Sequence, residues 1–216
     1  MTEVVVQRLA ARVVAGKDGA RVVSWAPYDM SALVSLPVST PHDVGRAFER
    51  ARQAQRVWAE TSVAERKKIM LRFHDLVLAR RDQILDLMQA ESGKARRDAF
   101  LEVLDIAATA LYYARVADAL LRPRRHRGAF PLLTRTTELR HPKGVVAVIS
   151  PWNYPLSPGA GDSIAALMAG NAVVQKPDTQ TALTALWAAE RMSESGLPEG
   201  LWQMVIGRGA SIGAPR

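Results

Sequence analysis

The stretch KGVVAVISPWNYPLSPGAGDSIAALMAGNAVVQKP, which runs from Lys143 to Pro177, decides the fold of this chain. It opens with a continuous apolar run over residues 145–149, which is typical of a parallel strand that is covered on both faces. Residues 158–168 predict a short helix, and the apolar run over 172–174 predicts a second strand. The order of strand, helix and strand is the first half of a doubly wound α/β unit.

The same alternation continues toward the C-terminus. Residues 181–195 predict a helix that stops at Gly196, and residues 202–206 predict a third buried strand. Short connections with right-handed crossovers make this βαβαβ order half of a doubly wound, Rossmann-like parallel sheet. The segment GRGASIG, residues 207–213, has its glycines at the wrong spacing for the dinucleotide fingerprint, and a simple tight turn is its alternative interpretation.

The upstream part of the chain predicts a helical layer preceded by short strands. Residues 1–40 are rich in Val, Pro and small polar residues, and they predict two or three short strands. Ser62 and Glu65 form a capping-box pattern at the start of one helix. Helices are expected from Thr40 to about Thr61, from Ser62 onward, over 80–90, and from about Asp98 to Leu121. Polar alternation within residues 124–141 then predicts a β-hairpin arm.

Composition narrows the class of protein. Of the 216 residues, 48% are hydrophobic and 23% are charged, which is typical of a folded globular protein. No apolar run approaches the roughly 20 residues of a membrane helix, so we expect no membrane span. The first residues do not form a secretory signal, and we therefore expect a cytoplasmic location. The absence of cysteine excludes disulfides and Cys-ligated metal sites, and no metal site is predicted.

A formal net charge of +8 raises the hypothesis of nucleic-acid binding. The basic residues of 46–97 alternate with acidic ones, however, as they do on exposed helix faces. One dense basic run covers residues 122–127, where we predict a solvated loop or a subunit-contact arm, because no nucleic-acid motif accompanies it. We therefore expect no nucleic-acid partner.

Candidate ligand-binding residues lie where the predicted strands end, because ligands of open parallel sheets bind at the carboxyl edge. After the first strand, Trp152 is a candidate wall of a site and Asn153 a candidate donor to a developing oxyanion. After the second, Lys176 is a candidate partner of a ribose or phosphate oxygen. From spacing alone, a core tryptophan, a turn asparagine and a surface lysine remain alternatives.

Several linked motifs resemble the NAD(P)-dependent aldehyde dehydrogenase superfamily. The segment ISPWNYPL over 149–156 is followed by AGNAVV and by the Lys176-Pro177 pair, and the segments ESGKAR over 91–96 and KPDTQT over 176–181 are similar to succinate-semialdehyde dehydrogenases. The resemblance covers about Val44 to Gly213. It implies a truncated aldehyde dehydrogenase fold of three parts: residues 1–121 are N-terminal strands and a helical layer, 122–142 are a hairpin oligomerisation arm, and 143–216 are the βαβαβ part of the NAD(P)-binding domain, with the C-terminal catalytic domain absent.

The resemblance also implies roles for individual residues. Asn153 would donate its side-chain amide to the oxyanion of the substrate, and Lys176 would bind the adenosine ribose. The remaining implied cofactor-binding residues are Ile149, Ser150, Pro151, Trp152, Pro177, Thr179 and Gly209. NAD-preferring members often have Glu at the position of Thr179, and a neutral hydroxyl there favours NADP over NAD because it does not repel a 2′-phosphate. We expect this binding to be weak.

The sequence departs from the family in one consequential respect. Family members use a catalytic Cys and a Glu, and both lie beyond the point that this chain reaches. Our first hypothesis is an N-terminal fragment of an enzyme that oxidises an aldehyde, such as succinate semialdehyde, to the acid, with the isolated chain inactive. The alternative is a non-catalytic nucleotide-binding or assembly module that partners a full-length relative. Expected partners are a small aldehyde and either a second copy or a C-terminal half.

Overall fold

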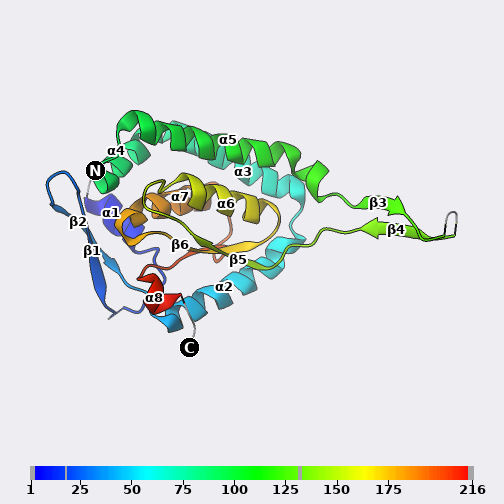
Figure 1. Ribbon diagram of the computed structural model, residues 1–216, viewed down its shortest axis with the longest axis horizontal. Helices are drawn as coiled ribbons and strands as arrows, with labels where there is room; N and C mark the ends of the chain where they lie inside the picture. Colours follow the sequence, from blue (N-terminus) through cyan, green and yellow to red (C-terminus); the bar gives the residue numbers. More distant parts are fainter. Residues whose placement is uncertain (1–2, 18, 131–132, 214–216) are drawn as a thin grey trace.

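A three-stranded parallel sheet forms the centre of the fold (Figure 1). The computed structural model describes residues 3–17, 19–130 and 133–213. In spatial order, the strands are β5 (Val145–Ile149), β6 (Ala172–Lys176) and β7 (Trp202–Met204). The predicted alternation of three strands and two helices is confirmed. β6 takes the central position, and its first four residues are buried.

Helices cover both faces of this sheet. α6 (Ser157–Met168) packs on β5 and β6, while α2 (Pro41–Glu60) crosses all three strands on the opposite face (Figure 1). The short 3₁₀ helix η1 (Thr179–Thr181) leads into α7 (Ala182–Glu194). Residues 182–192 of α7 are all buried, because this helix also packs against α1, α3 and α4. The apolar runs that predicted the fold are therefore explained by a three-layer arrangement.

A second helical layer lies over α6 and α7. It consists of α3 (Val63–Ala79), α4 (Arg81–Ser92) and α5 (Arg96–Leu121). Local sequence signals fix the ends of these helices. Ser62 and Glu65 form the predicted capping box at the start of α3. Gly93 ends α4 with a φ of 69°, a left-handed conformation that favours glycine.

The prediction of short N-terminal strands is confirmed for β1 (Arg21–Trp25) and β2 (Ala32–Pro37), which form an antiparallel pair. The prediction missed a helix before them, α1, which residues Glu3–Ala10 form. Val6, Leu9 and Ala10 are buried at helical spacing, and α1 packs on α7. The valine-rich composition favoured strands, but the contact with α7 decides the local structure.

Two further expectations need correction. β5 is not covered on both faces, since Ala147 is exposed and Ile149 is 76% exposed. The physical reason is that β5 lies at the edge of the described sheet, whereas α2 and α6 centre on β6. The third strand ends at Met204 rather than at residue 206. The glycine-rich segment is not simply a turn either, because it contains the short helix α8 (Gly209–Ile212).

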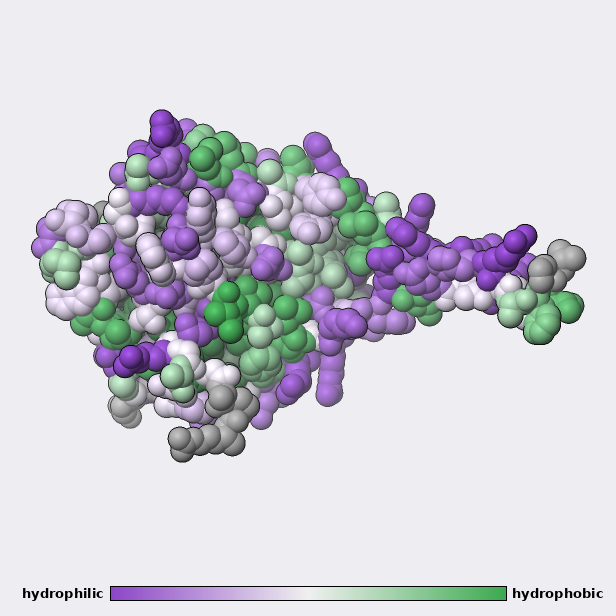
Figure 2. Space-filling view, viewed as in Figure 1, coloured by the Kyte–Doolittle hydropathy of each residue, from purple (hydrophilic) through white to green (hydrophobic). Residues whose placement is uncertain are grey.

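The predicted hairpin arm is confirmed as a local structure. β3 (Arg124–Arg127) and β4 (Arg135–Glu138) pair antiparallel and extend away from the rest of the chain (Figure 1). The strands are covered by hydrophilic residues, and hydrophobic residues lie toward the tip (Figure 2). There, Phe130 is 65% and Leu133 86% exposed. No helix within the described residues has the length and apolar character that a membrane crossing requires.

Candidate functional site

The loops that follow β5 and β6 lie side by side at the carboxyl edge of the sheet. Ile149 pairs with Lys176 in the strand register, and the backbone N–H of Ser150 donates to the carbonyl of Lys176 at 3.2 Å. The parallel register therefore brings the loop with Trp152 and Asn153 next to the Lys176 loop. This is the edge at which open α/β sheets bind ligands.

A buried hydrogen-bond network supports the start of the first loop. The Gln175 amide nitrogen donates to the Ser150 hydroxyl at 3.1 Å, and the Trp202 indole N–H donates to the Gln175 oxygen at 3.0 Å. Gly159 at the start of α6 lies against this network. A Cβ at Gly159 would stand 2.2 Å from the Gln175 amide nitrogen, so only glycine permits the close approach. Ser150 thus lies beneath the loop, where it makes a structural contact.

The tip of this loop faces solvent. Trp152 is 58% and Tyr154 54% exposed, and Asn153 is also exposed. The alternative of a core tryptophan is therefore wrong. Among the described residues, the side-chain amide of Asn153 makes no hydrogen bond, which leaves its N–H groups available for a ligand oxygen.

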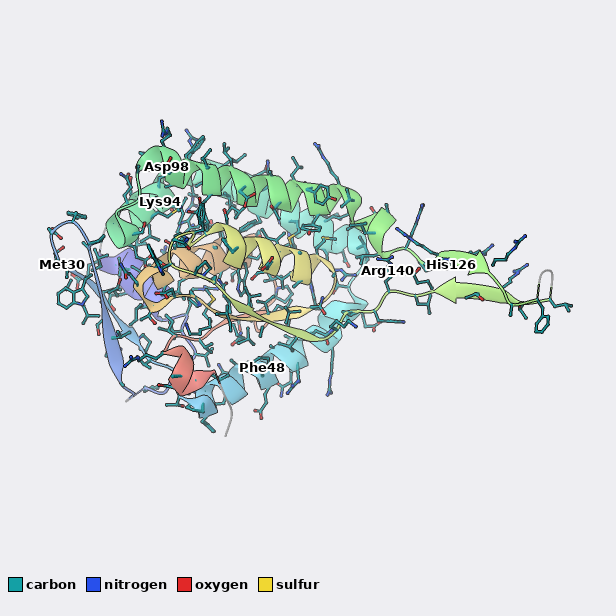
Figure 3. All side chains as sticks on the ribbon, in the orientation of Figure 1. Met30, Phe48, Lys94, Asp98, His126 and Arg140 are labelled. Carbon is teal, nitrogen blue, oxygen red and sulfur yellow. The ribbon has the colours of Figure 1, made fainter. Side chains whose placement is uncertain are left out.

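Ile149 and Lys176 also line a shared cavity of about 470 Å³ between the sheet and α2. Its other walls include Val44, Phe48 and Ile212, and the hydrophobic surface in this region is visible in Figure 2. Figure 3 shows Phe48 on α2, below the sheet. The ammonium of Lys176 donates to the carbonyl of Pro177 at 3.2 Å. A long cation beside an apolar wall is suited to a ligand that carries both a ring and hydroxyl oxygens.

The other predicted cofactor residues are spread more widely. Thr179 begins η1 and lines a separate hollow beside the β1–β2 hairpin, together with Trp25 and Met30. Gly209 is exposed at the start of α8. Neither residue lines the cavity beside Ile149. Pro151 is exposed in the loop after β5, and Pro177, which follows Lys176 directly, is buried.

The sequence analysis missed three charged residues that hold these loops. Lys94 and Glu102 contact the loop of Asn153, and Glu91 binds the start of α7. Glu91 is fully buried, and its carboxylate accepts hydrogen bonds from the N–H groups of Leu183 and Thr184 at 2.6 and 2.9 Å. Burial raises the pKa of Glu91 to about 8, although these hydrogen bonds lower it. Glu91 and Lys94 lie in the segment 91–96 that carried the family resemblance, but nothing in its spacing pointed to the loops.

No cluster of three or more His, Asp or Glu side chains that could hold a metal ion occurs within the described parts of the chain. The site therefore consists of an exposed amide, a lysine and apolar walls at the carboxyl edge of a doubly wound sheet. This arrangement defines a protein of the open α/β type.

The chain belongs to the aldehyde dehydrogenase family, because the model of that family matches residues 14–215. It is similar to a putative NADP(+) succinate-semialdehyde dehydrogenase of Mycolicibacterium smegmatis, with 52% identity over 181 residues. The match covers 84% of this chain and 35% of that protein. A relative with the same description in Mycobacterium ulcerans is 50% identical over the same shares of both chains. The chain thus spans about 35% of the length of these curated relatives.

Solved structures confirm the fold. A succinate-semialdehyde dehydrogenase from Burkholderia pseudomallei has a TM-score of 0.87 at 29% identity, covering 92% of this chain and 41% of that one. An NADP-dependent glyceraldehyde-3-phosphate dehydrogenase from Bacillus halodurans, in complex with NADP, has a TM-score of 0.86 at 33% identity and covers 92% and 42%. The fold is therefore a truncated aldehyde dehydrogenase fold, as the sequence resemblance implied.

Proposed function

We propose that this chain supplies the cofactor-binding loops and the oxyanion amide of an NADP-dependent enzyme that oxidises a semialdehyde to the acid. The observation that carries the proposal is the strand register of Ile149 with Lys176, which joins the two loops at one edge. The names of the relatives support succinate semialdehyde as the substrate. Because the chain has no cysteine, a thiol nucleophile must come from a further polypeptide segment.

The residues present fit a dinucleotide at this edge. The cavity beside Lys176 is apolar on the side of Ile149 and Phe48, as an aromatic base or a nicotinamide requires. The bound dinucleotide would accept the hydride of the aldehyde. Lys176 would donate to a ribose hydroxyl, and Asn153 would donate to the oxygen that gains negative charge when the thiol attacks the carbonyl.

The choice between NADP and NAD rests on Thr179. The side chain of Thr179 is neutral, so a 2′-phosphate beside it meets no charge from residue 179, whereas a glutamate there would repel the phosphate. β5 lies at the edge of the described sheet, and this edge offers a surface to which the segment with the nucleophile can dock.

Lys176→Ala is expected to weaken NADP binding at least about tenfold, because a charge-assisted hydrogen bond is lost. Thr179→Glu is expected to reverse a preference for NADP into one for NAD. Titration calorimetry of the chain and both variants with each cofactor measures these effects. Lys17→Ala, on an exposed segment before β1, is the matched lysine control. A parent chain that prefers NAD would contradict the role given to Thr179.

The alternative of an assembly module is favoured by one observation, the exposed arm of β3 and β4. We propose that its apolar tip contacts a second copy of the chain. Phe130→Ser with Leu133→Ser is then expected to lower the oligomeric state in sedimentation, since buried apolar area drives association. Val57→Ser changes an equally exposed apolar residue on α2 and is expected to have no effect. Equal sedimentation of the parent and the double variant would reject this role of the arm.

A further inference from the structure

Lys94 lies in the short connection between α4 and α5, on the opposite side of the sheet from Phe48 (Figure 3). Its ammonium donates to the backbone carbonyl of Asn153 at 3.0 Å and lies 4.0 Å from the centre of the Tyr154 ring. It also forms an ion pair with Glu102 of α5. The side chain of Lys94 is only 16% exposed, so these contacts take the place of most of its hydration.

Glu102 connects this lysine to the far end of the loop. Its side chain is 2% exposed, and its second carboxylate oxygen accepts the backbone N–H groups of Leu156 and Ser157 at 2.9 and 3.0 Å. These N–H groups lie at the start of α6, and Leu156 itself supplies no side-chain cap. A carboxylate from another helix therefore caps α6, where the helix dipole favours negative charge.

The loop is thus fixed at three points. Its first residue, Ser150, is held by Gln175 and by the backbone of Lys176. Its last residues are held by Glu102, and its middle is held by Lys94 through the carbonyl of Asn153 itself. Asn153 is exposed and lies between these anchors, so its neighbours in the loop do not fix its orientation by packing.

We propose that Lys94 and Glu102 are positioning residues that fix the peptide group of Asn153 and thereby aim its side-chain amide at the substrate oxygen. The inference deepens the proposed function and rests on the role of Asn153 given there. The ion pair does not touch the cofactor cavity, whose lining comes from α2 and the strand ends. It therefore acts on the oxyanion amide through the loop backbone.

Hydrogen–deuterium exchange of the whole chain tests whether Lys94 and Glu102 hold the Asn153 loop, and it needs neither cofactor nor substrate. Lys94→Met removes the ion-pair partner of Glu102, and it is therefore expected to raise exchange of the Leu156 and Ser157 amides at least about tenfold, while the buried amides of α7 keep the parent rate. Lys67→Met is the matched control. It removes a lysine that pairs with Asp118, which lies on α5 like Glu102 but away from the loop. Equal exchange of the Leu156 and Ser157 amides for the parent and Lys94→Met would overturn the proposal, as would a uniform rise across α7.

A spectroscopic measurement distinguishes an effect on the orientation of the Asn153 side chain from an effect on the stability of the fold. The side-chain amide signal of Asn153 in an NMR spectrum, assigned by its loss in Asn153→Asp, is expected to shift and narrow in Lys94→Met and to return in Lys94→Arg, which keeps the donor and the charge. Glu102→Gln is expected to give an intermediate shift, since one acceptor oxygen remains. An Asn153 signal that is the same in all variants overturns the proposal. A parent chain that binds neither NADP nor NAD would instead reject the proposed function and leave the exchange result intact.

Discussion

The purified 216-residue chain is expected to oxidise no aldehyde. It contains no cysteine, and loss of the nucleophile in an enzyme of another class costs about 10⁶ in rate. The oxyanion donor that we propose at Asn153 then has no covalent intermediate to stabilise. The measurement is the absorbance of reduced cofactor formed from succinate semialdehyde and NADP, compared with a boiled sample. Activity above that background that is lost on Asn153→Ala would refute the expectation.

Complementation provides the positive control. A second polypeptide, made from the part of the Mycolicibacterium smegmatis relative that this chain does not match, is added to the chain. If it docks on the exposed edge of β5, cofactor reduction is expected to appear. In that mixture, Asn153→Ala should lower the rate by about 10² to 10³, which is typical for removal of one oxyanion donor. Unchanged activity of Asn153→Ala would show that this amide does not serve the reaction.

The second large effect is expected at Glu91, which holds the start of α7. Glu91→Ala leaves the N–H groups of Leu183 and Thr184 and the Thr184 hydroxyl without their acceptor. We expect a loss of about 3 kcal/mol in the free energy of unfolding, since each buried unpaired group costs about 1–3 kcal/mol. Thermal and urea unfolding measure it. Glu65→Ala removes an exposed carboxylate that accepts from the backbone N–H and the hydroxyl of Ser62 at the start of α3, and it is expected to cost about 1 kcal/mol or less.

The raised pKa of Glu91 also predicts a pH dependence of stability. Below pH 4.5 the carboxyl is protonated in both the folded and the unfolded chain, and its contribution to stability is fully present. As the pH rises from 4.5 to about 8, the unfolded chain releases the proton while the folded chain keeps it. Stability therefore falls over this window, by at most about 1.4 kcal/mol per pH unit. Glu91→Gln should remove this slope, and a variant with the parent's slope would exclude Glu91 as its cause.

Local signals in the sequence were sufficient for most helix ends and for the order of the sheet. The capping box of Ser62 and Glu65 and the left-handed Gly93 act within a few residues of themselves. The apolar run that became β6 required only a buried, parallel environment, whereas the run that became β5 formed a strand whose Ala147 and Ile149 are exposed. The motif resemblance also identified the family, because linked segments over most of the chain agreed in order and spacing.

Contacts between distant residues decided the rest. The segment Glu3–Ala10 is a helix because it packs on α7, nearly two hundred positions away in the chain, where Arg8 bonds Glu190 at 2.7 Å. The roles of Lys94 and Glu102 likewise depend on the approach of α5 to the Asn153 loop. The partner of a charged residue cannot be identified from the sequence alone when that partner is distant in the chain.

The sequence by itself thus determined the family, the strand and helix order, and the presence of Asn153 and Lys176 at two strand ends. Only the tertiary structure decided that these two loops are neighbours in register, that β5 has an exposed edge, and that buried carboxylates fix the starts of α6 and α7. The reason is physical. Periodicity and capping are short-range properties, whereas burial of a charge and exposure of a strand depend on which elements pack together.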